Sequence, residues 1–221
     1  MTIYRIPPEV TAIIFDIDST LYTNKDYAFE QNDVQIRRFA KQNNMSDDKA
    51  RNLINSYRKE WSSLHNNATI SLANTLVDLG IPIEESIKWR KELLQPEKYL
   101  QEDLQLQETL KALSNKYQLY CLTNNPVSIG RRTLVTLGID GFISEIVGLD
   151  TTHLSKPALK PFETILQRAK CPVENCLAVG DRYSIDIEIP LEMGMGGILV
   201  DSVKDVYTLP QFTIFLNNRE S

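Results

Sequence analysis

The sequence predicts an α/β protein with a parallel β-sheet, helices on both faces of the sheet, and a helical segment inserted after the first strand. Short apolar runs alternate with helical patterns between residues 104 and 200, as in strand–helix–strand units. Another apolar run covers residues 10–15, and the stretch that follows it has helical patterning alone. We therefore assign residues 1–21 and 101–221 to a core domain and residues 22–100 to an inserted helical domain.

Composition narrows the class of protein. The chain has 221 residues, 42% hydrophobic and 24% charged, which is ordinary for a water-soluble globular protein. A net charge of −5 argues against a general nucleic-acid-binding protein. Apolar runs are too short to span a membrane, and residues 1–9 have no signal-peptide pattern. We expect a cytoplasmic protein without nucleic-acid or membrane partners, either a monomer or a dimer.

The first predicted strand ends at two aspartates. The apolar run reaches Phe15, and Asp16 and Asp18 follow it one residue apart. Such a run predicts a strand buried on both faces, with Asp16 at the carboxyl end, where open α/β sheets bind ligands. Two carboxylates that face one point repel each other unless a cation lies between them. An acidic turn after a strand is the simpler structural explanation.

The inserted segment has the patterns of four helices. Amphipathic stretches predict helices over residues 28–43, 47–67, 70–79 and 83–94. Ser46 is the predicted N-cap of the second helix, because acidic residues follow it in the first turn. No strand is expected in this segment.

The chain after the insertion alternates between the two kinds of element. Helices are predicted over residues 104–113, 126–137, 161–169 and 185–193, and strands over 117–122, 142–147, 176–179 and 197–200. Pro190 lies inside the last of these helices and predicts an irregularity there. The stretch from residue 203 onward has no clear pattern and is left unassigned.

Polar groups follow each of the later strands in the same way. Thr123 and Asn124 follow the second strand, Lys156 lies in the loop after the third, and Asp181 follows the fourth with Asp186 close behind. Each has a simple explanation as a helix cap, a solvated charge or a turn. Because the carboxyl ends of parallel strands lie at one edge of a sheet, we expect all of these groups to meet there.

Phosphoryl transfer is the chemistry that such a set of groups suits. A carboxylate can attack phosphorus and form an aspartyl-phosphate, and a second can protonate the leaving alcohol and then deprotonate water. Mg²⁺ prefers a few carboxylates together with water and phosphate, which fits Asp16, Asp181 and a backbone carbonyl. A cation and a lysine offset the repulsion between two anions.

The motifs together resemble those of the haloacid dehalogenase-like hydrolase superfamily. They occur in the order Asp16-Ile17-Asp18-Ser19-Thr20, Thr123-Asn124, Lys156-Pro157, and Gly180-Asp181 with Asp186 behind it. The resemblance implies a Rossmann-like core, with Asp16 as the nucleophile and Asp18 as the acid/base. Asp16, the backbone carbonyl of Asp18, and Asp181 would then ligate Mg²⁺.

The same resemblance implies roles for the remaining groups. Thr123 and Asn124 would bind the phosphoryl group, Lys156 would neutralise charge, and Asp186 would be a further or alternate metal ligand. The segment 22–100 looks like the C1 cap of the family, which closes over small substrates.

Three details refine the resemblance. The first motif looks closest to the pyrimidine 5′-nucleotidase-like branch, although Ser19 stands where asparagine is usual there. Dehalogenases lack an aspartate at the position of Asp18, which argues against halide chemistry. Lys160-Pro161 resembles the lysine motif too, but Lys156-Pro157 places Phe162 where the family has an aromatic residue.

The expected function is therefore that of a Mg²⁺-dependent phosphatase of a small phosphorylated metabolite, such as a nucleoside monophosphate. A sugar-phosphate mutase of the same superfamily and a non-catalytic phosphate-binding regulator are the alternatives. His65 in the insertion is expected to have a surface or packing role, whereas Trp61 suits a specificity lining or a helix packing stripe equally well. Arg182 follows a predicted metal ligand and suits either substrate contact or an exposed ion pair.

Overall fold

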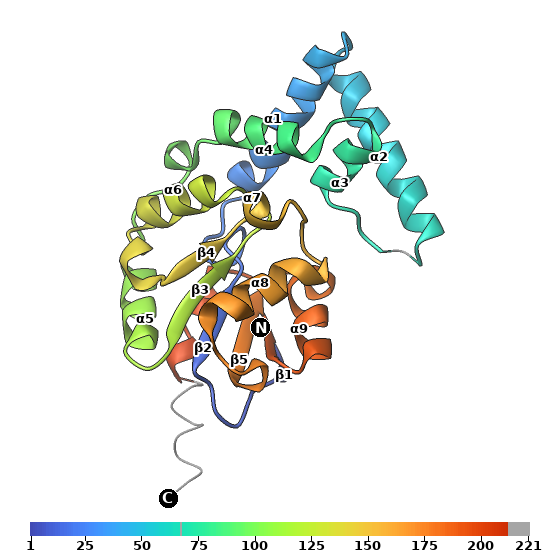
Figure 1. The fold of residues 1–221 in the computed structure, drawn as a ribbon. Helices are drawn as coiled ribbons and strands as arrows, with labels where there is room; N and C mark the ends of the chain where they lie inside the picture. Colours follow the sequence, from blue (N-terminus) through green and yellow to red (C-terminus); the bar gives the residue numbers. More distant parts are fainter. Residues whose placement is uncertain (67, 212–221) are drawn as a thin grey trace, which may run out of the picture. The chain divides into compact units, whose positions relative to one another are not determined.

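The computed structural model describes residues 1–66 and 68–211, and its centre is a six-stranded sheet (Figure 1). The strands are β1 (Thr2–Arg5), β2 (Ala12–Phe15), β3 (Gln118–Leu122), β4 (Glu145–Val147), β5 (Cys176–Gly180) and β6 (Gly196–Leu199). They lie in the order β1-β6-β5-β2-β3-β4. All neighbouring pairs are parallel except β1 and β6, which are antiparallel. The predicted α/β class is confirmed.

The chain divides into two compact units. Met1–Asn24 joins the part from Pro96 onward in one of them, which we call the core unit. Lys25–Gln95 forms the other, which we call the inserted unit. The inserted unit begins at residue 25, where residue 22 was predicted, and ends at residue 95, where residue 100 was predicted.

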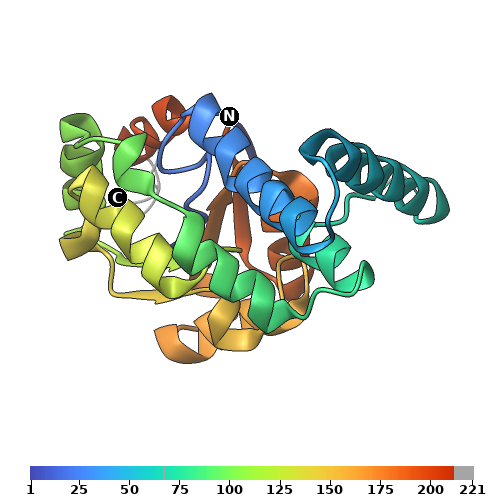
Figure 2. The same ribbon diagram turned by 90° about the horizontal axis from the view of Figure 1, so that it is seen from above.

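Within the described residues of the core unit, helices connect or follow the strands. They are α5 (Leu104–Ser114), α6 (Val127–Leu137), α8 (Leu159–Ala169), α9 (Glu188–Met193) and α10 (Val203–Val206), and the short α7 (Leu149–Thr152) precedes α8. Since crossovers between parallel strands are right-handed, connections that run in opposite directions along the sheet cover opposite faces. The path from β2 through β3 to β4 therefore places α5 and α6 on one face. The path from β4 back to β5 and β6 places α8 and α9 on the other (Figures 1 and 2).

The central strand β2 is buried on both faces. Ala12 and Ile14 pack in a cluster with Phe162 and Ile165 of α8. Side chains alternate along a strand, so Phe15 points to the opposite face, and it is fully buried as well. This burial explains why the strand has an uninterrupted apolar sequence.

The strand order also locates a crevice. β2 lies between β5 and β3, and from it the chain moves outward to β3 and β4 in one direction and later to β5 and β6 in the other. Ligands of open α/β sheets bind at such a switch point, outside the carboxyl ends of the strands. The segments that follow β2 and β5 are therefore where a site is expected.

The described residues of the inserted unit form four helices, α1 (Lys25–Gln42), α2 (Asp47–Leu64), α3 (Leu72–Asp78) and α4 (Ile83–Leu93). Its apolar core includes Phe39, Ile54, Leu76 and Trp89. The Ser46 side chain accepts a hydrogen bond from a backbone N–H of the first turn of α2, so the predicted N-cap is confirmed. Within the part of the chain that the structure describes, no helix is long and apolar enough to cross a membrane.

Several elements differ from those that the patterns predict. β1 was not predicted, because all four of its residues are exposed and leave no burial pattern. β4 begins at Glu145, since a 3₁₀ turn occupies Asp140–Phe142. The helix predicted from residue 185 is instead a π-helical turn over Tyr183–Ile187 followed by α9.

Candidate active site

A tight turn follows β2 and carries the two aspartates. The backbone N–H groups of Thr20 and Leu21 both donate to the carbonyl oxygen of Ile17, at 3.3 and 3.0 Å. Ser19 has a φ of 65°, in the left-handed region. The chain thus curls into about one helical turn, which brings side chains four residues apart onto the same side.

This turn gives each aspartate a hydroxyl partner. Thr20 Oγ1 donates to Asp16 Oδ2 at 3.2 Å. Tyr22 OH donates to Asp18 Oδ1 at 2.7 Å. Sequence patterns alone did not single out Thr20 or Tyr22 as partners, although a hydroxyl four residues after each aspartate is the signal that identifies them.

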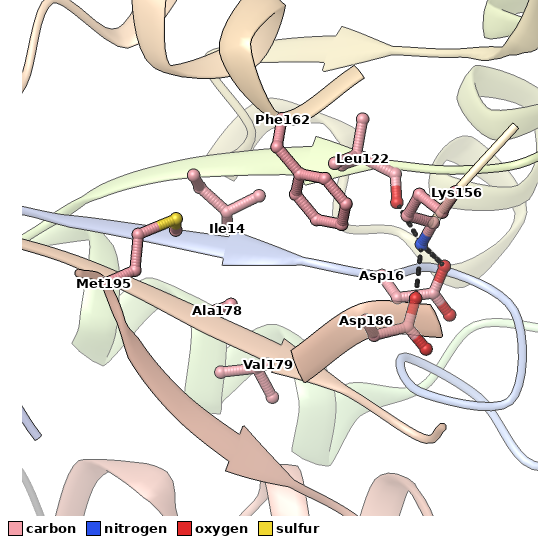
Figure 3. A pocket seen from close by; sticks show the side chains of 9 residues that line it. All are labelled: Ile14, Asp16, Leu122, Lys156, Phe162, Ala178, Val179, Asp186 and Met195. Atoms are coloured by element: carbon pink, nitrogen blue, oxygen red, sulfur yellow. Dashed lines mark hydrogen bonds and ion pairs between the residues drawn. The ribbon is translucent and has the colours of Figure 1, made fainter. Parts of the chain in front are cut away.

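The Lys156 ammonium lies at the centre of the site (Figure 3). Its Nζ donates to Asp16 Oδ1 at 2.6 Å, to Asp186 Oδ1 at 2.7 Å and to the carbonyl oxygen of Leu122 at 2.8 Å. The residue is only 1% exposed. Because an ammonium has three donors, all of its hydrogen-bonding capacity is used. Lys156 therefore links the end of β3 to the segments that follow β2 and β5.

The Asn124 side chain holds the backbone of Lys156. Its Oδ1 accepts from Lys156 N at 2.7 Å, and its Nδ2 donates to Lys156 O at 3.2 Å. The peptide bond between Lys156 and Pro157 is cis. The side chain of Asn124 thus ties the loop after β3 to the loop that carries the lysine, while its predicted phosphoryl contact stays a prediction.

Asp18 accepts two further hydrogen bonds from the segment after β3. Thr123 Oγ1 donates to Asp18 Oδ2 at 3.1 Å, and Asn125 Nδ2 donates to the same oxygen at 3.0 Å. The backbone N–H of Asn125 donates in turn to Thr123 Oγ1. With Tyr22, both oxygens of the Asp18 carboxylate are held. Asn125 is a third residue of the site to which the motifs assigned no role.

Three aspartates gather beside the lysine. One carboxylate oxygen from each of Asp16, Asp181 and Asp186 lies within 4.8 Å of the others. A Cβ at Gly180 would stand 2.3 Å from the Cβ of Asp186, so only glycine allows this approach. Oδ1 of Asp181 is buried and has no hydrogen-bond partner among the described residues, and Arg182 Nε lies 3.6 Å from it.

Burial makes the negative charge of these groups costly. Desolvation raises the pKa of Asp16 to about 7, although the nearby Lys156 ammonium opposes the shift. Desolvation and the charge of Asp186 raise the pKa of Asp181 to about 6. The pKa of Lys156 is raised as well, since the attraction of Asp16 and Asp186 outweighs its own desolvation. Three carboxylates thus face one ammonium.

These residues fit a divalent cation with a preference for oxygen ligands. The three carboxylates converge, their charge exceeds that of Lys156, and a buried oxygen of Asp181 lacks a hydrogen bond. Mg²⁺ favours this kind of donor set. A small cavity of about 10 Å³ adjoins the site, and its lining combines Lys156, Asp16 and Asp186 with apolar side chains such as Phe162 and Met195 (Figure 3).

The second lysine–proline pair lies outside the site. The side chain of Lys160 is 61% exposed, and its ammonium pairs with Glu163 at 3.7 Å. Lys156 is the one that meets Asp16. The side chain of Arg182 is half exposed, and its guanidinium group forms an ion pair with Asp181. This ion pair is one of the two roles expected for Arg182, and the other, contact with substrate, stays a prediction.

Known proteins resemble this chain in sequence and in fold. Residues 13–200 match the haloacid dehalogenase-like hydrolase family, and the chain belongs to this family. The chain also resembles curated phosphatases. It is 29% identical over 207 residues to the glyceraldehyde 3-phosphate phosphatase of Methanothermobacter thermautotrophicus, covering 86% of this chain and 85% of that protein.

A second curated relative is the 5-amino-6-(5-phospho-D-ribitylamino)uracil phosphatase YigB of Escherichia coli, 23% identical over 215 residues, with 88% of this chain and 85% of the relative covered. Among solved structures, a HAD phosphatase from Thermococcus onnurineus has a TM-score of 0.59 at 18% identity, covering 92% of this chain and 98% of that one. The structural likeness confirms the fold.

Proposed function

We propose that the protein is a Mg²⁺-dependent phosphatase that hydrolyses a small phosphomonoester through an aspartyl-phosphate on Asp16. The observation that carries this proposal is the arrangement around that carboxylate. Oδ1 of Asp16 is held by the Lys156 ammonium and Oδ2 by the Thr20 hydroxyl. Because its orientation is already fixed, this carboxylate can present an oxygen to phosphorus with little further loss of conformational entropy.

The reaction needs two displacements at phosphorus. In the first, an oxygen of Asp16 bonds to phosphorus, the bond to the ester oxygen breaks, and Asp18 gives its proton to the departing alcohol. In the second, Asp18 takes a proton from water, and the water oxygen bonds to phosphorus. The bond from phosphorus to Asp16 then breaks, so that inorganic phosphate leaves and both carboxyl groups return to their starting states.

Other residues of the core unit would hold the charges. Asp16, Asp181 and the backbone carbonyl of Asp18 would ligate Mg²⁺, with Asp186 as a further or alternate ligand. When bound, Mg²⁺ would offset the repulsion between the phosphate and the carboxylates. Lys156 would add a second positive charge, while Thr123 and Asn124 would hold phosphate oxygens together with backbone N–H groups at the start of the next helix.

The substrate is proposed to be a small phosphorylated metabolite of the cytoplasm. The curated relatives are named as phosphatases of glyceraldehyde 3-phosphate and of a phosphoribityl-aminouracil, which supports this size and charge class. A substrate screen should therefore include nucleoside monophosphates, sugar phosphates and triose phosphates. Lys25–Gln95 would act as a C1-type cap and supply the substrate specificity.

The proposal is tested by phosphate release from this screen. We expect Asp16→Asn to lose at least about 1,000-fold in kcat, because the nucleophile is gone. The control Asp140→Asn changes a half-buried carboxylate that pairs with Arg131 outside the site, and should retain wild-type turnover. EDTA should abolish activity and Mg²⁺ should restore it. Undiminished turnover by Asp16→Asn would reject the mechanism.

The same assay separates the two alternatives. A mutase would return the phosphoryl group to substrate, so an isomerised sugar phosphate would accumulate in place of inorganic phosphate. A non-catalytic regulator would bind phosphate esters without releasing phosphate at any Mg²⁺ concentration.

A further inference from the structure

We propose that Tyr22 is a positioning residue that orients the Asp18 carboxyl group for proton transfer to the leaving group. The inference rests on the proposed function, in which Asp18 is the acid/base. It concerns a hydrogen bond within one turn of the chain, from Tyr22 OH to Asp18 Oδ1 at 2.7 Å.

The hydrogen bonds around Asp18 divide between its two oxygens. Thr123 and Asn125 donate to Oδ2, and Tyr22 donates to Oδ1. The plane of a carboxyl group turns about the Cβ–Cγ bond, so donors on both oxygens restrain this rotation more tightly than the two donors on Oδ2 do. The Tyr22 bond to Oδ1 thus adds to the restraint on the plane of the Asp18 carboxyl group. Proton transfer requires this alignment, since misorientation of a catalytic group lowers the rate steeply.

Tyr22 suits this role because it is stiff. Its side chain is 3% exposed and has only two rotatable bonds between backbone and ring. The turn formed by residues 17–21 places it four residues after Asp18. Thr20 stands in the same relation to Asp16, so a single turn of backbone supplies a hydroxyl to each carboxyl group.

The expected effect depends on the leaving group. An alkyl phosphate expels a poor leaving group that needs the proton of Asp18, whereas p-nitrophenyl phosphate expels a phenolate that leaves readily without it. General acid catalysis contributes about 10²–10⁴-fold. We expect Tyr22→Phe to lower kcat for glycerol 2-phosphate by about 10-fold and kcat for p-nitrophenyl phosphate by less than about 3-fold.

The test is the ratio of these two kcat values, measured on one preparation of each variant with saturating Mg²⁺. The ratio does not depend on the folded fraction, so a partly destabilised Tyr22→Phe protein still gives an answer. The matched control is Tyr120→Phe, which removes the hydroxyl of another buried tyrosine of the core unit. That hydroxyl donates to Gln118. The control should leave the ratio at the wild-type value.

A double variant shows whether Tyr22 acts through Asp18. If it does, adding Tyr22→Phe to Asp18→Asn should leave the ratio of Asp18→Asn unchanged. The inference is overturned if Tyr22→Phe keeps the wild-type ratio, or if its effect multiplies with that of Asp18→Asn. A wild-type protein that releases no phosphate, or an active Asp16→Asn, would instead refute the proposed function.

Discussion

Lys156 combines features that rarely occur together, a full positive charge and nearly complete burial. Moving an ammonium out of water is costly, and the cost is recovered only where good acceptors replace the water. Here two carboxylates and one carbonyl provide three short hydrogen bonds. Lys156 therefore stays charged, because its ammonium and the buried carboxylates of Asp16 and Asp186 stabilise each other.

Removing this charge should destabilise the fold as well as the site. We expect Lys156→Met to cost about 3–5 kcal/mol in the free energy of unfolding, because Asp16 and Asp186 are left buried without their cation. The activity should fall by at least about 100-fold. Urea denaturation and a phosphate-release assay measure the two effects.

Lys160→Met is the matched control, since the same substitution removes an exposed charge before another proline. It should change the unfolding free energy by less than about 1 kcal/mol. Equal stability losses for the two variants would contradict the role of Lys156 in holding the carboxylates together.

At this scale the sequence predicted which charged residues meet, but not how they are held. Asp16, Lys156 and Asp181 could be chosen because each follows a strand, and strand ends share an edge. The partners of Asp18 depend on the curl of the turn and on the rotamers of Tyr22 and Asn125. No pattern of residue types encodes these.

Among the elements, α1 and α2 of the inserted unit are joined by a polar contact as well as by apolar packing. Asp33 of α1 is 4% exposed in its side chain, and its two oxygens accept from Arg51 of α2 at 2.7 and 3.0 Å. Arg37 pairs with Asp33 too. Two guanidinium groups hold the pKa of Asp33 below its ordinary value.

Asp33→Asn should therefore destabilise the inserted unit by about 1–3 kcal/mol at pH 7, the range for hydrogen bonds to charged groups. The pKa of Asp33 is lower in the folded state than its ordinary value of 3.8. The stabilisation by Asp33 is therefore fully present above pH 3.8 and is lost as the pH falls through the folded-state pKa. Urea midpoints of the variant and the wild type should thus converge at acidic pH.

Asp48→Asn provides the comparison, since Asp48 pairs with the same Arg51 but is 88% exposed in its side chain. Its effect should stay within about 1 kcal/mol at every pH. A loss as large as that of Asp33→Asn would show that burial of the carboxylate does not set the strength of this contact.

The elements themselves were predictable in proportion to their burial. β2, β3 and β5 form apolar runs because both of their faces are covered, and α2 has a recognisable cap. β1 lies at the edge with every residue exposed, so hydrogen bonding to β6 defines it and side-chain pattern does not. The π-helical turn before α9 places Asp186, and no local propensity distinguishes such a turn from an α-helix.

For the molecule as a whole, every residue of the candidate site belongs to the core unit. The groups come from segments after β2, β3, β4 and β5, which are far apart in sequence and meet at one edge of the sheet. A ligand of this site should therefore stabilise those segments together, because binding to the folded state alone raises the free energy of local opening.

Hydrogen–deuterium exchange with and without Mg²⁺ tests this coupling. We expect slower exchange in peptides that cover residues 16–22 and 180–187 when Mg²⁺ is added, since Asp16 and Asp181 lie there. Asp181→Asn should lose most of the effect. Slowing of equal size in that variant would show that the ion binds elsewhere.

The joint between the two units has a consequence for how such a chain can diversify. Asn24 Nδ2 donates to the carbonyl oxygen of Tyr99 at 2.7 Å. Both residues belong to the core unit, so this hydrogen bond joins the segment that leaves the core unit to the segment that re-enters it. Recombination that exchanges residues 25–95 would therefore keep this hydrogen bond and every residue of the candidate site. The inserted unit can thus change in evolution while the candidate site stays the same.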